Sequence, residues 1–307
     1  MKSNILLSSR RDFLQTSAAA AASLLIGSQF EFKKKKQLLS FSTLACPDWS
    51  FQQIVDFAVH HNYSGIELRG LQRQMDLSKC SEFSSENRSA TLALMKEKGL
   101  QFVNLGSSAT LHFAEGAERQ KNIDEGKRFI DLAHEINCPY IRVFPNNFPK
   151  EQDKSATIDL IIKGLVELGD YAKDARVTVL METHGDVVKS EDLEVVMRSS
   201  EHPNVGLVWD ACNMWMVTKE APATMYQKLR KYIRHTHIKD LTMVDGKAQY
   251  KLLGKGESPI FEVISLLKKD GFKGYYSFEW EKLWHPEIDE PEIALADYPK
   301  VMKQRLK

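Results

Sequence analysis

The sequence has few of the features that mark specialised classes of protein. Its 42 basic and 41 acidic residues leave a formal net charge of only +1 over 307 residues. So little excess charge gives no long-range attraction to phosphate backbones or anionic membranes. No apolar run reaches the roughly 20 residues that a membrane-spanning helix requires. We therefore expect neither a nucleic-acid partner nor stable insertion into a membrane.

Cysteine and glycine are also sparse, at 4 and 16 residues. The cysteines show no paired spacing, and a chain of this length needs no disulfide staple. We expect small buried side chains at Cys46, Cys80, Cys138 and Cys212. The glycine fingerprint of a dinucleotide site is missing, because the Gly-Lys-Gly sequence at residues 254–256 lacks the remaining spacing of that motif.

The first thirty residues differ in composition from the rest of the chain. The sequence Ser-Ser-Arg-Arg-Asp-Phe-Leu at residues 8–14 precedes an alanine-rich, weakly apolar stretch that ends near Gly27. This combination is typical of a bacterial twin-arginine signal peptide. We expect a signal over residues 1–30, a linker over residues 31–37, passage through the twin-arginine translocon, and a mature protein that is periplasmic or exported. An amphipathic membrane anchor is the alternative, and the short apolar stretch argues against it.

From residue 38 onward, short apolar runs alternate with longer helical patterns, which is typical of repeated βα units around a parallel sheet. The predicted strands are Leu38–Ala45, Gly65–Arg69, Gln101–Gly106, Tyr140–Phe144, Val177–Thr183, Val205–Asp210, Ile233–Lys239 and Tyr275–Glu281. The predicted helices are Phe51–His61, Ser85–Lys98, Glu118–Ile136, Ala156–Ala175, Glu191–Ser199, Ala223–Tyr232, Ile260–Lys269 and Glu292–Arg305. Eight such units favour an α/β protein with one (β/α)8 TIM barrel domain over residues 38–307, rather than an open doubly wound sheet.

Strands five to eight of this prediction end in residues that bind metals. Reactive groups of a TIM barrel lie at the C-terminal ends of its strands. Clustered carboxylates repel one another and are costly to bury unless a cation neutralises them. A single acid at a strand end is more often a salt-bridge partner or a helix cap, but four ligand types in register favour a metal site. The predicted ligands are Glu182, Asp210, His237 and Glu279.

This ligand set is rich in oxygen and predicts one divalent ion. Carboxylates with a single imidazole suit Mn²⁺ or Mg²⁺ and leave room for Co²⁺ or Zn²⁺. Of these we expect Mn²⁺ first. The absence of thiolate ligands argues against a closed structural zinc site.

The motifs at the strand ends resemble those of the xylose isomerase-like barrel superfamily, in its sugar phosphate isomerase/epimerase and inosose dehydratase group. The strongest pieces are Glu-Thr-His at residues 182–184, His-Ile-Lys-Asp at 237–240 and Glu-Trp-Glu at 279–281. Residues 46–50 and 65–68 are softer matches, and the resemblance covers essentially all of the chain after the leader. It implies one Mn²⁺, Co²⁺ or Mg²⁺ on the four ligands named above. It further implies that Glu182 and Glu279 are the catalytic pair, moving protons on opposite faces of a ketose while the cation stabilises an enediolate.

Other side chains share the inward phase of the strands or follow strand ends. Imidazole, ammonium and carboxylate groups there are expected to contact substrate or metal ligands, with simple packing in the barrel mouth as the alternative. Two indole faces suit the apolar side of a sugar ring. The predicted substrate-binding residues are His184, Asn213, His235, Lys239, Glu281, Trp49 and Trp284.

Three further assignments follow from position. Asn213 stands where many relatives carry a histidine, so it can bind a hydroxyl but cannot relay a proton. Arg69 and Arg142, at the ends of strands two and four, bind an acidic group or form an ion pair in the barrel mouth. Trp209 and Trp280 have the opposite phase to the ligands and are expected in the core.

The predicted reaction is isomerisation or epimerisation of a ketose or another small sugar derivative. A dehydratase or lyase acting on keto-inositols or 3-keto-glycosides is the alternative, since both reactions begin by removing a proton next to a carbonyl. A non-catalytic sugar-binding protein would be expected to lose one of the two glutamates. A nuclease of the endonuclease IV type would need more metals, more ligands and a basic face.

Overall fold

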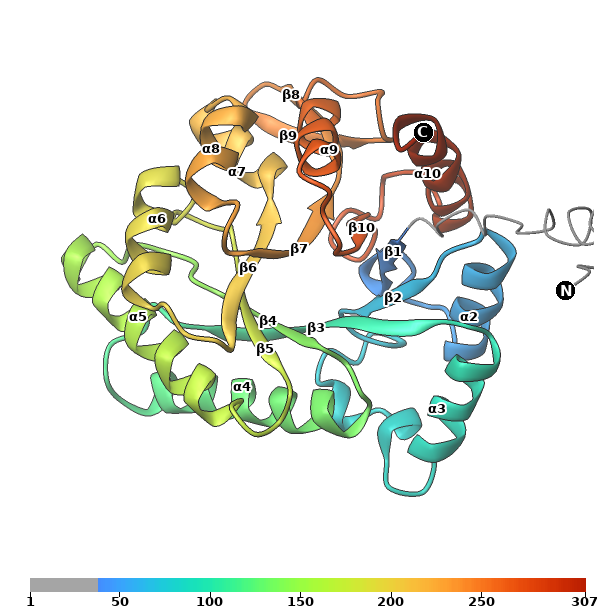
Figure 1. The fold of residues 1–307 in the computed structure, drawn as a ribbon, viewed down its shortest axis with the longest axis horizontal. Helices are drawn as coiled ribbons and strands as arrows, with labels where there is room; N and C mark the ends of the chain where they lie inside the picture. Colours follow the sequence, from blue (N-terminus) through green and yellow to red (C-terminus); the bar gives the residue numbers. More distant parts are fainter. Residues whose placement is uncertain (1–37) are drawn as a thin grey trace, which may run out of the picture. The chain divides into compact units, whose positions relative to one another are not determined.

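Eight parallel strands close into a barrel in the computed structural model, which describes residues 38–307 of the chain (Figure 1). Around the barrel the strand order is β1-β10-β7-β6-β5-β4-β3-β2, and each neighbouring pair is parallel. The barrel strands are β1 (Leu39–Ser42), β2 (Gly65–Leu68), β3 (Gln101–Thr110), β4 (Tyr140–Phe144), β5 (Thr178–Glu182), β6 (Val205–Asp210), β7 (Ile233–Ile238) and β10 (Tyr276–Phe278). This confirms the predicted single-domain TIM barrel.

Helices cover the outside of the barrel (Figure 1). They are α2 (Phe51–His60), α3 (Arg88–Glu97), α4 (Ala117–Glu135), α5 (Lys154–Tyr171), α6 (Ser190–Ser199), α7 (Ala211–Thr218), α8 (Pro222–Leu229), α9 (Ile260–Lys269) and α10 (Pro291–Arg305). Helix α9 shows the pattern that directs them inward, because its buried residues Ile260, Val263, Ile264 and Leu267 recur at helical spacing. The start of α2 is fixed by a capping box in which Ser50 and Gln53 satisfy each other's backbone N–H groups.

The apolar core fills both the barrel and the layer between strands and helices. Trp209 and Trp280 are 0% and 1% exposed, which confirms their predicted place in the core. The stacked rings of Phe278 and Tyr298, with centroids 4.5 Å apart, pack β10 against α10. All four cysteines are free and buried, as expected.

The structure adds elements that the sequence did not predict. Helix α7 follows directly on β6, because the Asp210 side chain accepts the backbone N–H of Asn213 and caps the helix. The first strand ends at Ser42 rather than residue 45, since its side chain caps a short 3-10 turn. The last barrel strand is three residues long, so Glu279 lies just beyond it.

An antiparallel hairpin, β8 (Asp240–Val244) and β9 (Lys247–Lys251), is inserted after β7. The periodicity of the sequence did not predict this hairpin. The Asp240 carboxylate closes its base by accepting hydrogen bonds from the backbone N–H groups of Gly254, Gly256 and Ser258. The Gly-Lys-Gly sequence therefore belongs to a structural loop around a carboxylate.

The expected signal peptide and linker, residues 1–37, lie outside the described residues. Among residues 38–307, no helix combines the length and apolar character that crossing a membrane demands.

Candidate metal centre

The four predicted metal ligands meet at the C-terminal end of the barrel. Each of Glu182, Asp210, His237 and Glu279 offers a ligand atom, and these atoms all lie within 4.8 Å of one another. Strand register brings them together: Asp210 is paired with His237 across β6 and β7. The backbone N–H of Glu279 is held by Ile238 O at 3.1 Å. All four residues are at most 5% exposed, so their charges are screened little by water.

Asp210 has two tasks, divided between its carboxylate oxygens. Its Oδ1 accepts the N–H of Asn213 at 2.8 Å and so caps α7. Its Oδ2 lies 3.9 Å from His237 Nδ1 and 2.9 Å from Lys239 Nζ. The helix cap fixes the rotamer of the acid, and the second oxygen is aimed at the centre of the cluster.

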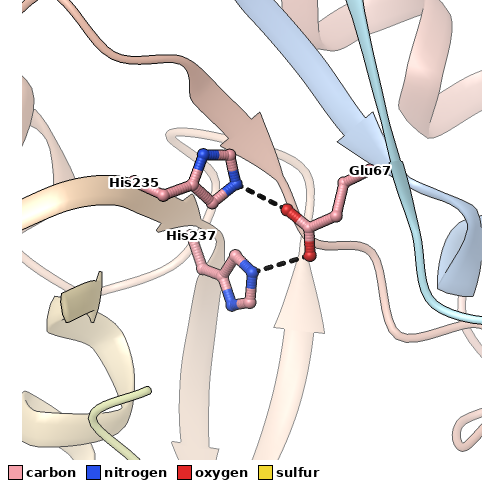
Figure 2. Close-up of side chains that lie close together, drawn as sticks. All are labelled: Glu67, His235 and His237. Carbon is pink, nitrogen blue, oxygen red and sulfur yellow. Dashed lines mark hydrogen bonds and ion pairs between the residues drawn. The ribbon is translucent and has the colours of Figure 1, made fainter. Parts of the chain in front are cut away.

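His237 is held from both sides of its ring. Its Nδ1 lies 3.3 Å from carboxylate oxygens of both Glu182 and Glu279. Its Nε2 lies 2.9 Å from Oε1 of Glu67, a fully buried residue of β2 on the far side of β10 and β1 (Figure 2). With Nε2–H donating to Glu67, the lone pair of Nδ1 faces the four-residue cluster, as a metal ligand requires.

Glu67 is a residue of the candidate site that the sequence did not predict. Its second oxygen accepts a hydrogen bond from His235 Nε2 at 2.6 Å (Figure 2). The same oxygen accepts one from Ser277 Oγ at 2.9 Å. Burial raises its pKa, but the charges and hydrogen bonds of the two histidines outweigh that effect and keep the carboxyl ionised. The feature of the sequence that could have identified it is an acidic residue within the otherwise apolar strand sequence Gly-Ile-Glu-Leu.

The charges of the cluster show what kind of ion it fits. Burial raises the pKa of Asp210 to about 7, and the charges of Glu182 and Glu279 add to the rise despite Lys239. Burial lowers the pKa of His237, but the surrounding carboxylates hold it well above its usual value. Three buried carboxylates thus draw two positive charges toward them, a proton on His237 and the ammonium of Lys239. A divalent cation supplies the same charge, so the residues fit such an ion.

Lys239 lies beside the cluster and links it to Glu281. Its Nζ is 2.8 Å from Glu279 Oε2 and 2.7 Å from Glu281 Oε1. Burial lowers the pKa of this lysine, but Asp210 and the two glutamates raise it well above its usual range. The ammonium therefore remains charged and can donate hydrogen bonds to a substrate oxygen.

A cavity of about 100 Å³ opens directly over the cluster. Four of the predicted substrate-binding residues line it: His184, Lys239, Glu281 and Trp284. Its other walls are Glu182, Glu279, Leu44, Arg69, Arg142 and Phe144. The space suits a small molecule whose polar groups reach the two glutamates.

The other three predicted contacts lie elsewhere. His235 is fully buried on the Glu67 side of His237. Asn213 donates from Nδ2 to Glu182 Oε1 at 3.4 Å, so it touches a candidate ligand without lining the cavity. The Trp49 ring packs against Phe57 of α2, with centroids 4.9 Å apart. Direct contact of these three residues with substrate stays a prediction.

Comparison with known proteins agrees with this architecture. The family model described as a xylose isomerase-like TIM barrel matches residues 55–303. A 3-dehydroshikimate dehydratase of Bacillus anthracis is 25% identical over 199 residues, which cover 64% of this chain and 68% of that protein.

Two solved structures share the fold at low sequence identity. The IOLI protein with a bound zinc atom has a TM-score of 0.74 at 18% identity, over 88% of this chain and 98% of that one. A D-tagatose 3-epimerase-like protein has a TM-score of 0.70 at 18% identity, over 88% of this chain and 97% of that one. Because the family model spans most of the described residues, the chain belongs to the xylose isomerase-like TIM barrel family.

Proposed function

We propose that this protein is a divalent-metal-dependent isomerase or epimerase of a small sugar-like ketone. The observation that carries the proposal is the buried cluster of Glu182, Asp210, His237 and Glu279 beneath a cavity. The family includes epimerases and a dehydratase, so removal of a proton next to a carbonyl is chemistry that this fold supports. We propose Mn²⁺ as the physiological ion.

Two carboxylates are available to move that proton. Glu182 and Glu279 both line the cavity and flank His237. Burial raises the pKa of each, but neighbouring positive charges bring both below their usual value, so both are ionised at neutral pH and able to accept a proton. A bound divalent cation would stabilise the enediolate left when the proton departs. In an epimerisation one glutamate takes the proton and the other returns one to the opposite face.

Lys239 and Arg142 give the two glutamates different surroundings. Lys239 donates to Glu279 Oε2, so it orients this carboxylate and disfavours its protonation. Glu182 Oε2 makes no hydrogen bond and is left with Arg142 Nε at 3.3 Å. The two glutamates thus have different surroundings, and Glu182 is the better placed to give and take protons.

A dehydratase or lyase is the second candidate. The similarity to a 3-dehydroshikimate dehydratase favours it. The site also holds a base and a separate proton donor, since Glu182 and Lys239 both line the cavity. Elimination needs only one base and a donor for the leaving hydroxyl, and these two residues can meet that need.

The test is incubation of the purified protein with Mg²⁺ in deuterated water and a panel of ketoses, keto-inositols and 3-keto-glycosides, followed by NMR. An epimerase places solvent deuterium at the epimerised carbon of the product. A lyase releases water or an alcohol and yields an unsaturated product. If no substrate exchanges its α-proton with any divalent metal, the proposed chemistry is wrong.

We further propose that residues 1–30 form a twin-arginine signal and that the mature protein works outside the cytoplasm. The support is the arginine pair at residues 10–11 followed by a weakly apolar, alanine-rich stretch. This route carries folded proteins, so the barrel would load its metal before export, where competing Cu²⁺ and Zn²⁺ are better controlled.

A further inference from the structure

Two arginines of the cavity wall are buried without a full set of hydrogen-bond partners. Arg69 follows β2 and is 8% exposed, and Arg142 in β4 is 1% exposed. Nη1 of Arg69 makes no hydrogen bond, and neither do Nε and Nη1 of Arg142. Both side chains line the cavity that contains Glu182 and Glu279. Buried N–H groups without acceptors are costly, so these groups point to an acceptor that enters from the cavity.

Both guanidinium groups are held in place by their surroundings. Nη2 of Arg69 donates to Ser108 Oγ at 3.1 Å. The guanidinium of Arg142 lies over the Phe144 ring, 3.7 Å from its centroid. Gly106 of β3 lies between the two, and a Cβ there would be 2.6 Å from Arg69 Cδ and 2.8 Å from Arg142 Nη2. A glycine at this position therefore lets two long cationic side chains pass close to each other.

Their charges are only partly compensated by the protein. Burial and the charge of Arg142 lower the pKa of Arg69 to about 9. Arg142 lies 3.3 Å from Glu182 Oε2, but that carboxylate also faces His237. Two like charges side by side in a buried wall favour an anion between them.

We propose that Arg69 and Arg142 form a carboxylate-binding subsite, so that the natural substrate is a polyhydroxylated keto acid. The inference rests on the proposed function, which places the reacting carbonyl against Glu182 and Glu279. Each guanidinium presents a planar fork of N–H donors that matches the two oxygens of a carboxylate.

The other lining residues favour a carboxylate over a phosphate. Three acidic side chains, Glu182, Glu279 and Glu281, share the cavity of about 100 Å³. A dianionic phosphate would meet more repulsion there than a singly charged carboxylate. Because Arg142 contacts Glu182 directly, the bound carboxylate lies only a few bonds from the reacting carbon. A compact acid, in which only a few bonds separate the carboxylate from the ketone, meets this requirement.

The test compares ligands that differ in charge but not in ring size. Affinities of quinate, myo-inositol and D-glucose 6-phosphate are measured by calorimetry on the Mg²⁺-loaded protein. Quinate should bind at least about tenfold more tightly than myo-inositol. Arg69→Gln should weaken quinate binding by about 10- to 100-fold, the range for a lost charge-assisted hydrogen bond, and leave myo-inositol within about twofold.

Arg69 is the main target because it makes no hydrogen bond to a candidate metal ligand, whereas Arg142 touches Glu182. Arg73→Gln is the matched control, since Arg73 is exposed and pairs with Asp48. Arg69→Lys keeps the charge and serves where the Gln variant fails to fold. It should retain part of the preference for quinate.

Three results would overturn the subsite: equal affinity for quinate and myo-inositol, tighter binding of D-glucose 6-phosphate than of quinate, or quinate binding unchanged by both Arg69 variants. The proposed reaction fails separately. If quinate binding depends on Arg69 but neither the compounds of the NMR panel nor a polyhydroxylated keto acid exchanges its α-proton, the subsite stands and the catalytic proposal falls. If neutral ketoses exchange and quinate does not bind, the reverse holds.

Discussion

Replacing Glu67 by Gln should weaken metal binding although Glu67 is not among the four candidate ligands. The Glu67 carboxylate accepts three hydrogen bonds, from His235, His237 and Ser277. An amide has one oxygen to accept with and an NH2 group that needs an acceptor of its own. If that NH2 faces His237 Nε2, the ring must carry its proton on Nδ1, the nitrogen that faces the other candidate metal ligands.

Loss of such a hydrogen-bonded partner of a metal-binding histidine costs about 10- to 100-fold in metal affinity, or about 1.4–2.7 kcal/mol. Calorimetric titration with Mn²⁺ or Zn²⁺ measures the change. Long-range proton–nitrogen NMR of ¹⁵N-labelled, metal-free protein shows which nitrogen of His237 carries the proton. Circular dichroism melting separates this effect from general unfolding.

Ser277→Ala is the matched control, because it removes a donor from the same carboxylate without touching His237. It should change metal affinity by less than about threefold, the size of one neutral hydrogen bond or less. The reasoning is refuted if Glu67→Gln binds metal as tightly as the parent. It is also refuted if the parent binds two ions per chain, since Glu67, His235 and His237 would then themselves be ligands.

Three further outcomes are expected. Glu182→Gln and Glu279→Gln should each lower kcat by about 10²–10⁴-fold or more, measured with any substrate that exchanges its α-proton; a variant that still exchanges at the parental rate has kept its base. Because the surrounding carboxylates raise the pKa of His237, a bound metal must displace its proton at neutral pH, so the affinity for metal should increase with pH. Calorimetric titrations in buffers of different ionisation enthalpy should show about one proton released per ion, and heats that do not depend on the buffer would contradict this. Changing Arg10 and Arg11 to Lys should retain the precursor in the cytoplasm, and unchanged appearance in the periplasmic fraction would disprove the signal.

The sequence predicted the barrel and the meeting of the four ligands because both depend on local patterns. Strand and helix periodicities determine the fold class, and the ends of neighbouring parallel strands meet at one edge. Glu67 could not be assigned in this way. Its partners are on β7 and β10, about 170 and 210 residues away, and only the closed barrel brings these strands together.

Other features could not be predicted from the sequence because tertiary contacts override local sequence patterns. The place of Asn213 depends on Asp210 acting as both cap and candidate ligand, which ends β6 in a helix rather than a loop. Trp49 follows a strand end, yet its ring turns to Phe57 instead of the cavity. Side-chain direction after a strand ends is set by packing, which periodicity does not encode.

The base of the β8–β9 hairpin, closed by Asp240, affects which parts of this protein can change during evolution. Its carboxylate closes the hairpin insertion with hydrogen bonds to residues 254–258, so both ends of the insertion are pinned whatever lies between them. Lengthening a surface insertion costs little free energy, and a pinned one transmits little strain to the barrel. At its base Tyr250, which pairs with Leu241, lies close to Lys239, whose Nζ is 5.8 Å from the ring centroid. Mutation and selection can therefore remodel the far end of the hairpin while the candidate metal ligands on the barrel stay unchanged, so this surface can evolve separately from the site.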